Sequence, residues 1–383
     1  MNRYTAIYAR RGVMSYAKGL EGVVVDETKV SNVEGEIGRL TYRGYPIEAL
    51  VSQDYVTVMW LVLFGDLPSD GQRLSLETYL SLHGSLSDSD VNLLRSLQST
   101  LHPMAMLQGM IPLLQMSDVN FSSLDSDTSQ GLQIVAKIPT LIAYYHRIQE
   151  GLPLIEFRPE MSYLESFLMM FNGQAAEEQS IEVLKVAQIL QLEHSFNAGT
   201  FASKCVSSTL ASINAVMAAG VGALSGELHG GADEAAVMAA REAASPENAK
   251  AFVSKLLAQK GKLMGMGHRE YKVVDPRALI LKPMAKSLCK GTQAENLYET
   301  LQALETEFNS VMQARGKELW ANVEYYKGAV FVALGIPSDN FTALFAMARS
   351  VGWLAHFMED RQDNRIFRPK AEYTGVKYRE LSV

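Results

Sequence analysis

Cysteine is scarce in this sequence. Cys205 and Cys289 are the only two thiols among 383 residues. Two cysteines cannot build a disulfide framework, and such low usage is typical of a reducing compartment. The first sixteen residues also lack the continuous apolar run of a secretory signal. The sequence therefore predicts a cytoplasmic protein.

Positively charged residues and long apolar runs are also few. Lys and Arg number 35 against 42 Asp and Glu, a net charge of −7, which argues against a nucleic-acid partner. Residues 205–226 carry no charge and are long enough to cross a bilayer, the alternative that their length leaves open. Because they contain six Ser, Thr and Asn residues and many Ala and Gly, we expect a buried core or interface helix and no membrane partner.

Several catalytic motifs are absent. The histidines lack HxxxH or HxH spacing and cysteine partners, so the sequence predicts no metal site. No GxSxG motif of a serine hydrolase occurs. The GxG at residues 265–267 lacks the context and third glycine of a dinucleotide fingerprint, and the GxG at 220–222 lies inside a helical pattern. Both are weak indications of NAD.

Helical periodicity is abundant. Residues 20–45 show short β-branched runs typical of small antiparallel strands, and residues 116–130 form a polar, loop-like stretch. Elsewhere apolar residues recur three and four apart, and Ser245-Pro246 and Asp275-Pro276 resemble helix starts. The sequence predicts an all-α protein with a minor N-terminal β decoration. The predicted helices cover residues 55–64, 134–150, 161–171, 178–193, 201–223, 234–244, 249–259, 279–288, 295–314 and 341–359.

Three of the seven histidines lie in unusual local contexts. His194 precedes an Asn-Ala-Gly break, His229 is followed by two glycines and a predicted helix, and His268 lies between glycines and a cationic run. Glycines let a backbone approach a ligand closely, and helix N-termini favour anions. A single such histidine is more often structural, but three together indicate a site.

Cationic residues indicate what this site binds. Lys262, Arg269, Lys272 and Arg277 surround His268, and most such charges are simply solvated. Arg349, however, interrupts an apolar helical pattern, where an unpaired charge is costly. It needs a carboxylate from the protein or from a substrate. The combination predicts a dicarboxylate pocket with histidines that polarise a carbonyl group.

Nine segments, in this order and spacing, resemble the citrate synthase family over nearly the whole chain. The resemblance implies an all-helical homodimer with a large domain (residues 1–221 and 326–383) and a small domain (222–325) that closes over substrate. The segments are GEIGRLTYRGYPIEAL, LHPMAMLQ, AKIPTLIAYYHRI, LEHSFNAGTF, GALSGELHGGADEA, GMGHREYKVVDPRA, NVEYYKGAVFVALGIP, FTALFAMARSVGWLAHFMED and NRIFRPKAEYTG.

The resemblance also implies an activity. Such an enzyme, which serves the tricarboxylic acid cycle, condenses acetyl-CoA with oxaloacetate and hydrolyses the thioester to citrate and CoA. It uses acyl-CoA as a co-substrate and needs neither a metal nor a permanently bound cofactor. Two alternatives stay open. The LEHSFNA and EDRQDNRIFRP stretches are similar to 2-methylcitrate synthase, which uses propionyl-CoA. A catalytically weakened member would bind oxaloacetate or CoA as a sensor or partner.

The roles that the resemblance implies fall into three groups. The catalytic residues are His229, His268 and Glu324: His229 binds the thioester oxygen, His268 binds the ketone oxygen of oxaloacetate, and Glu324 removes a proton from the acyl group. The oxaloacetate ligands are His194, Arg277, Arg349 and Arg368, with Arg368 supplied by the partner subunit. The CoA-binding residues are Lys272, Lys262 and Arg269 at the phosphates and Gly265, Met266 and Gly267 at the adenine.

This sequence departs from the family pattern near the site. Glu324 stands where the family has an aspartate, and a misplacement of about 1 Å can cost roughly 100-fold in rate. Asp233 stands where the family has an asparagine, Met266 where it has a phenylalanine and Lys204 where it has an arginine. These departures suggest a slow enzyme, a rebuilt pocket or a different acyl substrate.

Overall fold

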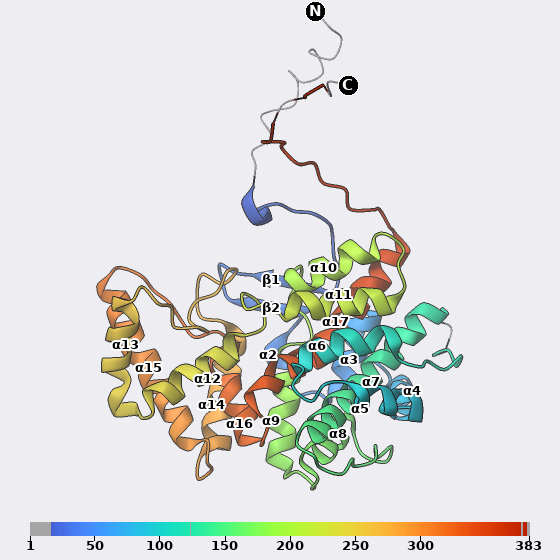
Figure 1. Ribbon diagram of the computed structural model, residues 1–383, viewed down its shortest axis with the longest axis horizontal. Helices are drawn as coiled ribbons and strands as arrows, with labels where there is room; N and C mark the ends of the chain where they lie inside the picture. Colours follow the sequence, from blue (N-terminus) through green and yellow to red (C-terminus); the bar gives the residue numbers. More distant parts are fainter. Residues whose placement is uncertain (1–16, 123, 377, 381–383) are drawn as a thin grey trace, which may run out of the picture.

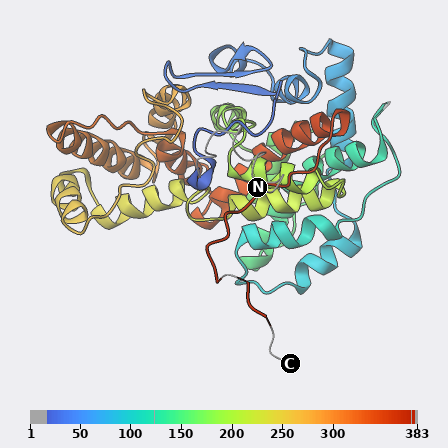
Figure 2. The ribbon, with the colours of Figure 1, turned by 90° about the horizontal axis from the view of Figure 1, so that it is seen from above.

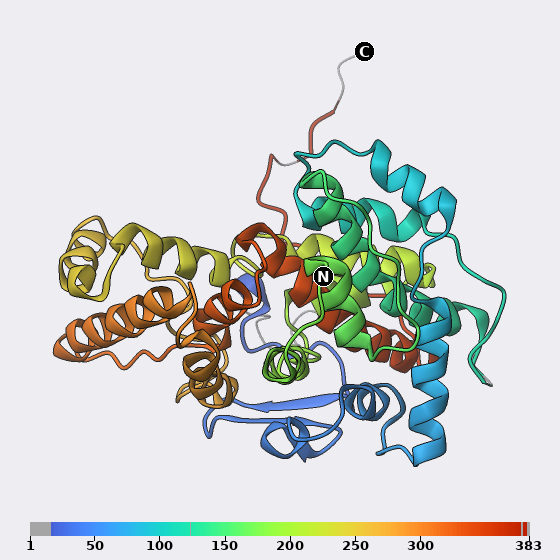
Figure 3. The ribbon, with the colours of Figure 1, turned by 90° about the horizontal axis from the view of Figure 1, so that it is seen from below.

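The computed structural model describes residues 17–122, 124–376 and 378–380, so the segment inspected for a secretory signal lies outside the described residues. Three short strands form an antiparallel sheet in the order β1 (Ser31–Glu34), β2 (Arg39–Tyr42) and β3 (Tyr45–Pro46). Ser31 pairs with Tyr42, and Thr41 pairs with Pro46. Figure 3 shows this small sheet at the edge of the helical body. The predicted β decoration is confirmed.

Helices form nearly all the other regular structure of the described residues, as predicted (Figure 1). In chain order they are η1 (Lys18–Leu20), α2 (Ile47–Leu50), α3 (Tyr55–Phe64), α4 (Asp70–His83), α5 (Asp88–Ser96), α6 (Pro103–Met110), η2 (Ile111–Leu113), α7 (Ser126–Gln149), α8 (Tyr163–Asn172), α9 (Glu178–Ile189), α10 (Ala198–Ser207), α11 (Ile213–Leu224), α12 (Ala232–Ala243), η3 (Pro246–Asn248), α13 (Ala249–Ala258), α14 (Pro276–Cys289), α15 (Glu295–Ala314), α16 (Val323–Ala333), η4 (Ser338–Asn340) and α17 (Phe341–Gln362).

Two long helices, α7 and α17, form the centre of the larger group of helices. Both are buried over most of their length because apolar residues occupy nearly every face. They approach closely at Gly131, where an added Cβ would lie 2.4 Å from a methyl group of Leu354. This core supports Arg349, which lies in the middle of α17 with 1 % of its surface exposed.

The helices α12, α13, α14, α15 and α16 pack against one another at one side of the molecule. They contact each other in the pairs α12–α16, α14–α16 and α13–α15. Figure 2 shows them projecting beyond the helices that surround α17. The segments that carry His229 and His268 lie next to this group, one before α12 and the other before α14.

The uncharged stretch from Cys205 to Gly226 was predicted to form one helix, and this prediction is wrong. The chain breaks between α10 and α11, where Leu210 adopts φ = 64°. The small residues of α11 pack within the same chain: a Cβ on Gly220 would lie 2.6 Å from Ser203 Oγ and 2.7 Å from Trp353. No helix of the described residues is both long and apolar enough to cross a membrane.

The polar stretch at residues 116–130 is only partly a loop. Helix α7 begins at Ser126, eight residues before the predicted start at residue 134, because Asp125 caps it by accepting from Thr128 N–H at 2.9 Å. The helices α4, α5, α6 and α16 were not predicted. Asp275 caps α14 as expected, whereas the Ser245 side chain forms no capping bond at η3.

Candidate functional site

His194 forms an aromatic cluster with His268 and Tyr271, which come from a distant segment of the chain. The rings of His194 and His268 lie 5.3 Å apart, and those of His268 and Tyr271 lie 4.6 Å apart. His194 Nε2 lies 3.1 Å from the Tyr271 hydroxyl. Burial, together with the charge of Arg277, holds the pKa of His194 well below its usual value. This histidine is therefore neutral at pH 7.

His268 has a defined tautomer. Its Nδ1 accepts from the backbone N–H groups of Glu270 (3.0 Å) and Tyr271 (3.2 Å), so its proton resides on Nε2. Burial and the charge of Arg277 lower its pKa to about 4. Nε2 lies 3.2 Å from Arg277 Nη2, which is also a donor. Two donor nitrogens thus lie side by side, close enough for one acceptor such as a ketone oxygen to bind both.

His229 lies in the turn that precedes α12. Gly199 N–H donates to His229 Nε2 at 3.3 Å, and Asn197 Oδ1 lies 3.2 Å from the same nitrogen. Gly199 N–H is a donor and Asn197 Oδ1 is an acceptor, so these contacts fit a proton on either ring nitrogen, and Nδ1 makes no hydrogen bond to another residue in the described part of the chain. Burial and the charge of Arg349 lower the pKa of His229 to about 4. His229 is thus a neutral imidazole with a free ring nitrogen.

Glu324, in the first turn of α16, is a buried carboxylate whose charge acts on both His229 and His268. Its negative charge raises the pKa of both His229 and His268, opposing the effect of burial. Gln191 Nε2 donates to Glu324 Oε1 at 2.8 Å, and Lys327 Nζ donates to Oε2. Because only 8 % of Glu324 is exposed, these two donors fix most of the carboxylate's position.

Arg277 is oriented by a neighbouring carboxylate. Asp275 Oδ1 accepts from Arg277 Nε at 3.0 Å, and Oδ2 accepts from Nη2 at 2.9 Å. Asp275 Oδ2 also accepts from the backbone N–H of Val323 at 3.1 Å. This carboxylate therefore ties the start of α14 to the start of α16, and with it Arg277 to the helix that carries Glu324.

Arg349 is buried beside a second ionic group, as its place in an apolar helix predicted. Its Nε donates to the Gln191 carbonyl at 2.8 Å, and Nη1 has no hydrogen-bond partner among the described residues. Burial lowers its pKa, while the nearby charge of Glu193 opposes this. Glu193 itself accepts from His356 Nε2 at 3.0 Å. A free guanidinium N–H thus remains for a further carboxylate.

A cavity of about 200 Å³ adjoins this cluster, and His268, Tyr271 and Lys272 contribute to its walls. Gly265 and Gly267 adopt φ of 80° and 88°, and Met266 pairs with Ala321 in an isolated β-bridge. The side chains of Lys262, Arg269 and Lys272 are exposed. The structure thus brings Lys272 and Gly267 to the edge of the site.

Arg368 is not brought to the site within this chain. The chain leaves α17 along the surface, where Phe367 N–H donates to Ser208 Oγ at 3.2 Å, and then runs away from the body (Figure 1). Arg368 is exposed and donates to the neighbouring Pro369 carbonyl at 3.0 Å.

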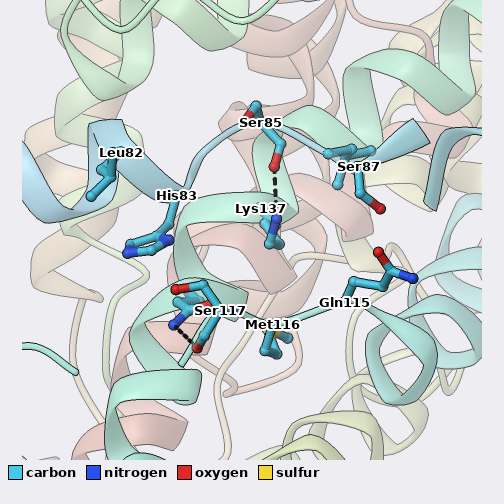
Figure 4. A pocket seen from close by; sticks show the side chains of 10 residues that line it. Leu82, His83, Ser85, Ser87, Gln115, Met116, Ser117 and Lys137 are labelled. Atoms are coloured by element: carbon cyan, nitrogen blue, oxygen red, sulfur yellow. Dashed lines mark hydrogen bonds between the residues drawn. The ribbon is translucent and has the colours of Figure 1, made fainter. Parts of the chain in front are cut away.

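Another cavity, of about 310 Å³, lies between α4, α7 and the segment around Met116 (Figure 4). Lys137 and Gln133 have protein partners there, whereas His83 Nε2 has no hydrogen-bond partner among the described residues. Lys137 Nζ donates to the Ser85 carbonyl at 2.7 Å, and Gln133 Nε2 donates to the Ser117 carbonyl at 3.0 Å. None of the predicted site residues lines it.

Comparison with known proteins shows the family of this chain. The family model for the citrate synthase C-terminal domain matches residues 19–370. The chain belongs to the citrate synthase family. It is 36 % identical to citrate synthase from Synechocystis sp. over 94 % of this chain and 91 % of that protein. It is 33 % identical to 2-methylcitrate synthase from Mycobacterium tuberculosis, covering 95 % and 92 %.

A solved citrate synthase structure matches the whole fold. It is the enzyme from Thermoplasma acidophilum in a ternary complex with carboxymethyl coenzyme A and oxaloacetate, which superposes with a TM-score of 0.89. It is 29 % identical and covers 96 % of this chain and 98 % of its own. The all-α fold expected from the resemblance is confirmed.

Four groups of this citrate synthase family site were not found from the sequence. Gln191, Asn197, Tyr271 and Lys327 each contact a predicted site residue. Asn197 and Tyr271 stand within the quoted motifs, so their proximity to His194 and His268 in the chain was an available signal. Lys327 offered another: it is a charged residue inside the apolar segment VEYYKGAVFVA.

Proposed function

We propose that this protein condenses acetyl-CoA with oxaloacetate and hydrolyses the resulting thioester to citrate and CoA. The observation that carries the proposal is the proximity of two donor nitrogens, His268 Nε2 and Arg277 Nη2, which lie 3.2 Å apart. Two neighbouring donors favour an oxygen that gains negative charge. The ketone oxygen of oxaloacetate is such an oxygen.

The first step is enolisation of the acyl group. Glu324 accepts a proton from the methyl carbon next to the thioester, and the electron pair of that C–H bond moves toward the thioester oxygen. His229 donates from Nδ1 to this oxygen as negative charge develops. A neutral donor suits this role, and the pKa of about 4 keeps His229 neutral at pH 7.

The second step forms the carbon–carbon bond. The enol carbon attacks the ketone carbon of oxaloacetate, whose oxygen receives the donors of His268 and Arg277 and ends as a hydroxyl group. His194, Arg277 and Arg349 bind the two carboxylates of oxaloacetate, since a guanidinium matches a carboxylate bidentately. Water then cleaves the thioester, which releases CoA as the thiol and leaves citrate.

CoA binds at the side of the site that Gly265, Met266 and Gly267 border, with the adenine beside their backbone. Lys272 borders the cavity, and with Lys262 and Arg269 it meets the phosphates. In this account residues 222–325 form a small domain that closes over both substrates, and residues 1–221 and 326–383 form the large domain. The protein acts in the cytoplasm and needs no metal.

A homodimer completes the site in this proposal. Arg368 is exposed on a segment that projects from its own subunit, together with exposed Tyr373 (78 %) and Val376 (57 %). Such a segment suits exchange with a second copy, where Arg368 binds oxaloacetate. Mixing inactive His268→Gln and Arg368→Ala proteins after subunit exchange should restore about one quarter of wild-type activity. No recovery in exchanged dimers would contradict this role of Arg368.

The decisive experiment is product analysis by mass spectrometry with acetyl-CoA and oxaloacetate. We expect citrate and free CoA in equal amounts. The second candidate is 2-methylcitrate synthesis from propionyl-CoA, which the similarity to the Mycobacterium tuberculosis enzyme favours. A kcat/KM for propionyl-CoA above that for acetyl-CoA would select this candidate. Oxaloacetate binding without any product would select the sensor interpretation.

A further inference from the structure

Lys327 is a fully buried charge beside the proposed base. It lies one turn after Glu324 on α16, and 0 % of its surface is exposed. Its Nζ contacts Glu324 Oε2 and lies 3.0 Å from Asp233 Oδ2. Asp233, in the first turn of α12, is also 0 % exposed. One lysine therefore bridges two carboxylates that belong to different helices.

The net charge of this cluster depends on all three side chains. Lys327 and Glu324 alone would form a neutral ion pair, and a strongly paired carboxylate is a weaker base. Asp233 adds a second negative charge, so the three groups together carry −1. The cluster therefore keeps the net charge of a single carboxylate while the lysine holds Glu324 in place.

The cluster also explains two departures from the family pattern together. Glu324 is one methylene longer than the aspartate of the family, and this length lets its carboxylate reach Lys327 at i+3 while Gln191 holds the other oxygen at 2.8 Å. Lys327 in turn requires a counter-ion, which Asp233 supplies in place of the family's asparagine. The ammonium also lies over the Phe345 ring, 4.5 Å from its centroid.

We propose that Lys327 and Asp233 are positioning residues for Glu324, in which Lys327 orients the carboxylate and Asp233 balances the charge of the lysine. This inference rests on the proposed function, in which Glu324 accepts the proton of the acyl group. It adds two residues to the machinery of the site, neither of which touches substrate. Helix α16 contacts both α12, which carries Asp233, and α9, which ends shortly before Gln191 (Figure 1).

Other charged or titratable groups also face Glu324 and must stay constant in a test. They come from the turn before α12, the segment before α14, α14 itself and α17. They are His229, His268, Arg277 and Arg349, whose pKa values all respond to the charge of Glu324.

The test compares Lys327→Met, Asp233→Asn and the double variant. Lys327→Met leaves two buried carboxylates without a counter-ion, so we expect a lower thermal midpoint and a large loss of kcat. The double variant removes one charge of each sign and should recover the thermal midpoint. It should still lose about 10- to 100-fold in kcat because Gln191 alone holds the carboxylate, with KM for oxaloacetate unchanged. Lys250→Met, at an exposed position of α13, is the control.

Wild-type kcat, KM and pH profile in a folded double variant would overturn the proposal, because the cluster would then be merely structural. An infrared measurement separates this result from failure of the proposed function. The carboxylate band of Glu324, assigned by its loss in Glu324→Gln, should shift in the double variant and give way to a protonated carboxyl band in Lys327→Met. An unchanged band in both would overturn the proposal even if the wild-type protein formed no citrate.

Discussion

The two carboxylate oxygens of Asp275 accept from one edge of the Arg277 guanidinium, Oδ1 from Nε at 3.0 Å and Oδ2 from Nη2 at 2.9 Å. The same carboxylate accepts from the N–H of Val323, one residue before Glu324. Arg277 is thereby held in place before any ligand binds. A site whose cationic groups are already oriented loses less conformational entropy when a dicarboxylate arrives.

Asp275→Asn should destabilise the fold strongly. Asp275 is 2 % exposed and Arg277 is 4 % exposed, so the variant leaves a buried arginine without its carboxylate. Breaking a buried ion pair in this way costs about 3–5 kcal/mol. Denaturant unfolding measures this loss, with the exposed Asp363→Asn as the control that should change stability by less than about 0.5 kcal/mol. Equal stability of the two variants would contradict the role of Asp275.

His268→Gln should reduce kcat by about 10²- to 10⁴-fold, because it removes the Nε2–H donor at the ketone oxygen. Fixed-time assays of CoA release measure this effect. His102→Asn is a matched control, since His102 is an exposed N-cap of α6 and asparagine is a good N-cap residue. If both variants kept wild-type turnover, His268 would have no part in the reaction.

Glu324→Asp should lower turnover rather than raise it. The shorter side chain cannot keep both the Gln191 and the Lys327 contacts, and a displacement of about 1 Å costs roughly 100-fold in rate. Steady-state kinetics with acetyl-CoA test this, with Glu299→Asp at an exposed position of α15 as the control. A rise in turnover would mean that the native glutamate is misplaced for this substrate.

Much of the helical fold could be predicted, and the failures have local reasons. Helix α16 was missed because its residues are buried on nearly all sides, so its apolar residues show no 3.6-residue period. The break between α10 and α11 was missed because Ser, Thr and small residues continue across it. Helices α4 and α5 had usable signals: Ser69 with Gln72, and Ser87 with Asp90, form capping boxes.

The predicted site residues stand in motifs, but their contacts depend on tertiary structure. His194 and Tyr271 are 77 positions apart in the chain, and Gln191 and Glu324 are 133 apart. Single-sequence periodicity contains no signal for such pairs. Arg349 is the exception, because a charge inside an apolar helix already indicates a buried partner.

The pair of His356 and Glu193 should make stability depend on pH. Burial lowers the pKa of His356, but the charges of Glu193 and Glu359 outweigh this and raise it to about 9 from 6.5. The stabilisation is complete below about pH 6.5 and is lost as the pH rises through 9, with a size of about 3 kcal/mol. The difference in unfolding free energy between wild type and His356→Gln should therefore shrink over this range. A constant difference would contradict the charged pair.

CoA thiol release measured with and without oxaloacetate tests the central claim most directly. We expect release from acetyl-CoA only when oxaloacetate is present, and its near loss in both Glu324→Gln and His268→Gln. Release that is independent of oxaloacetate, or no release with acetyl-, propionyl- or butyryl-CoA by a folded protein that still binds oxaloacetate, would contradict the proposed condensation.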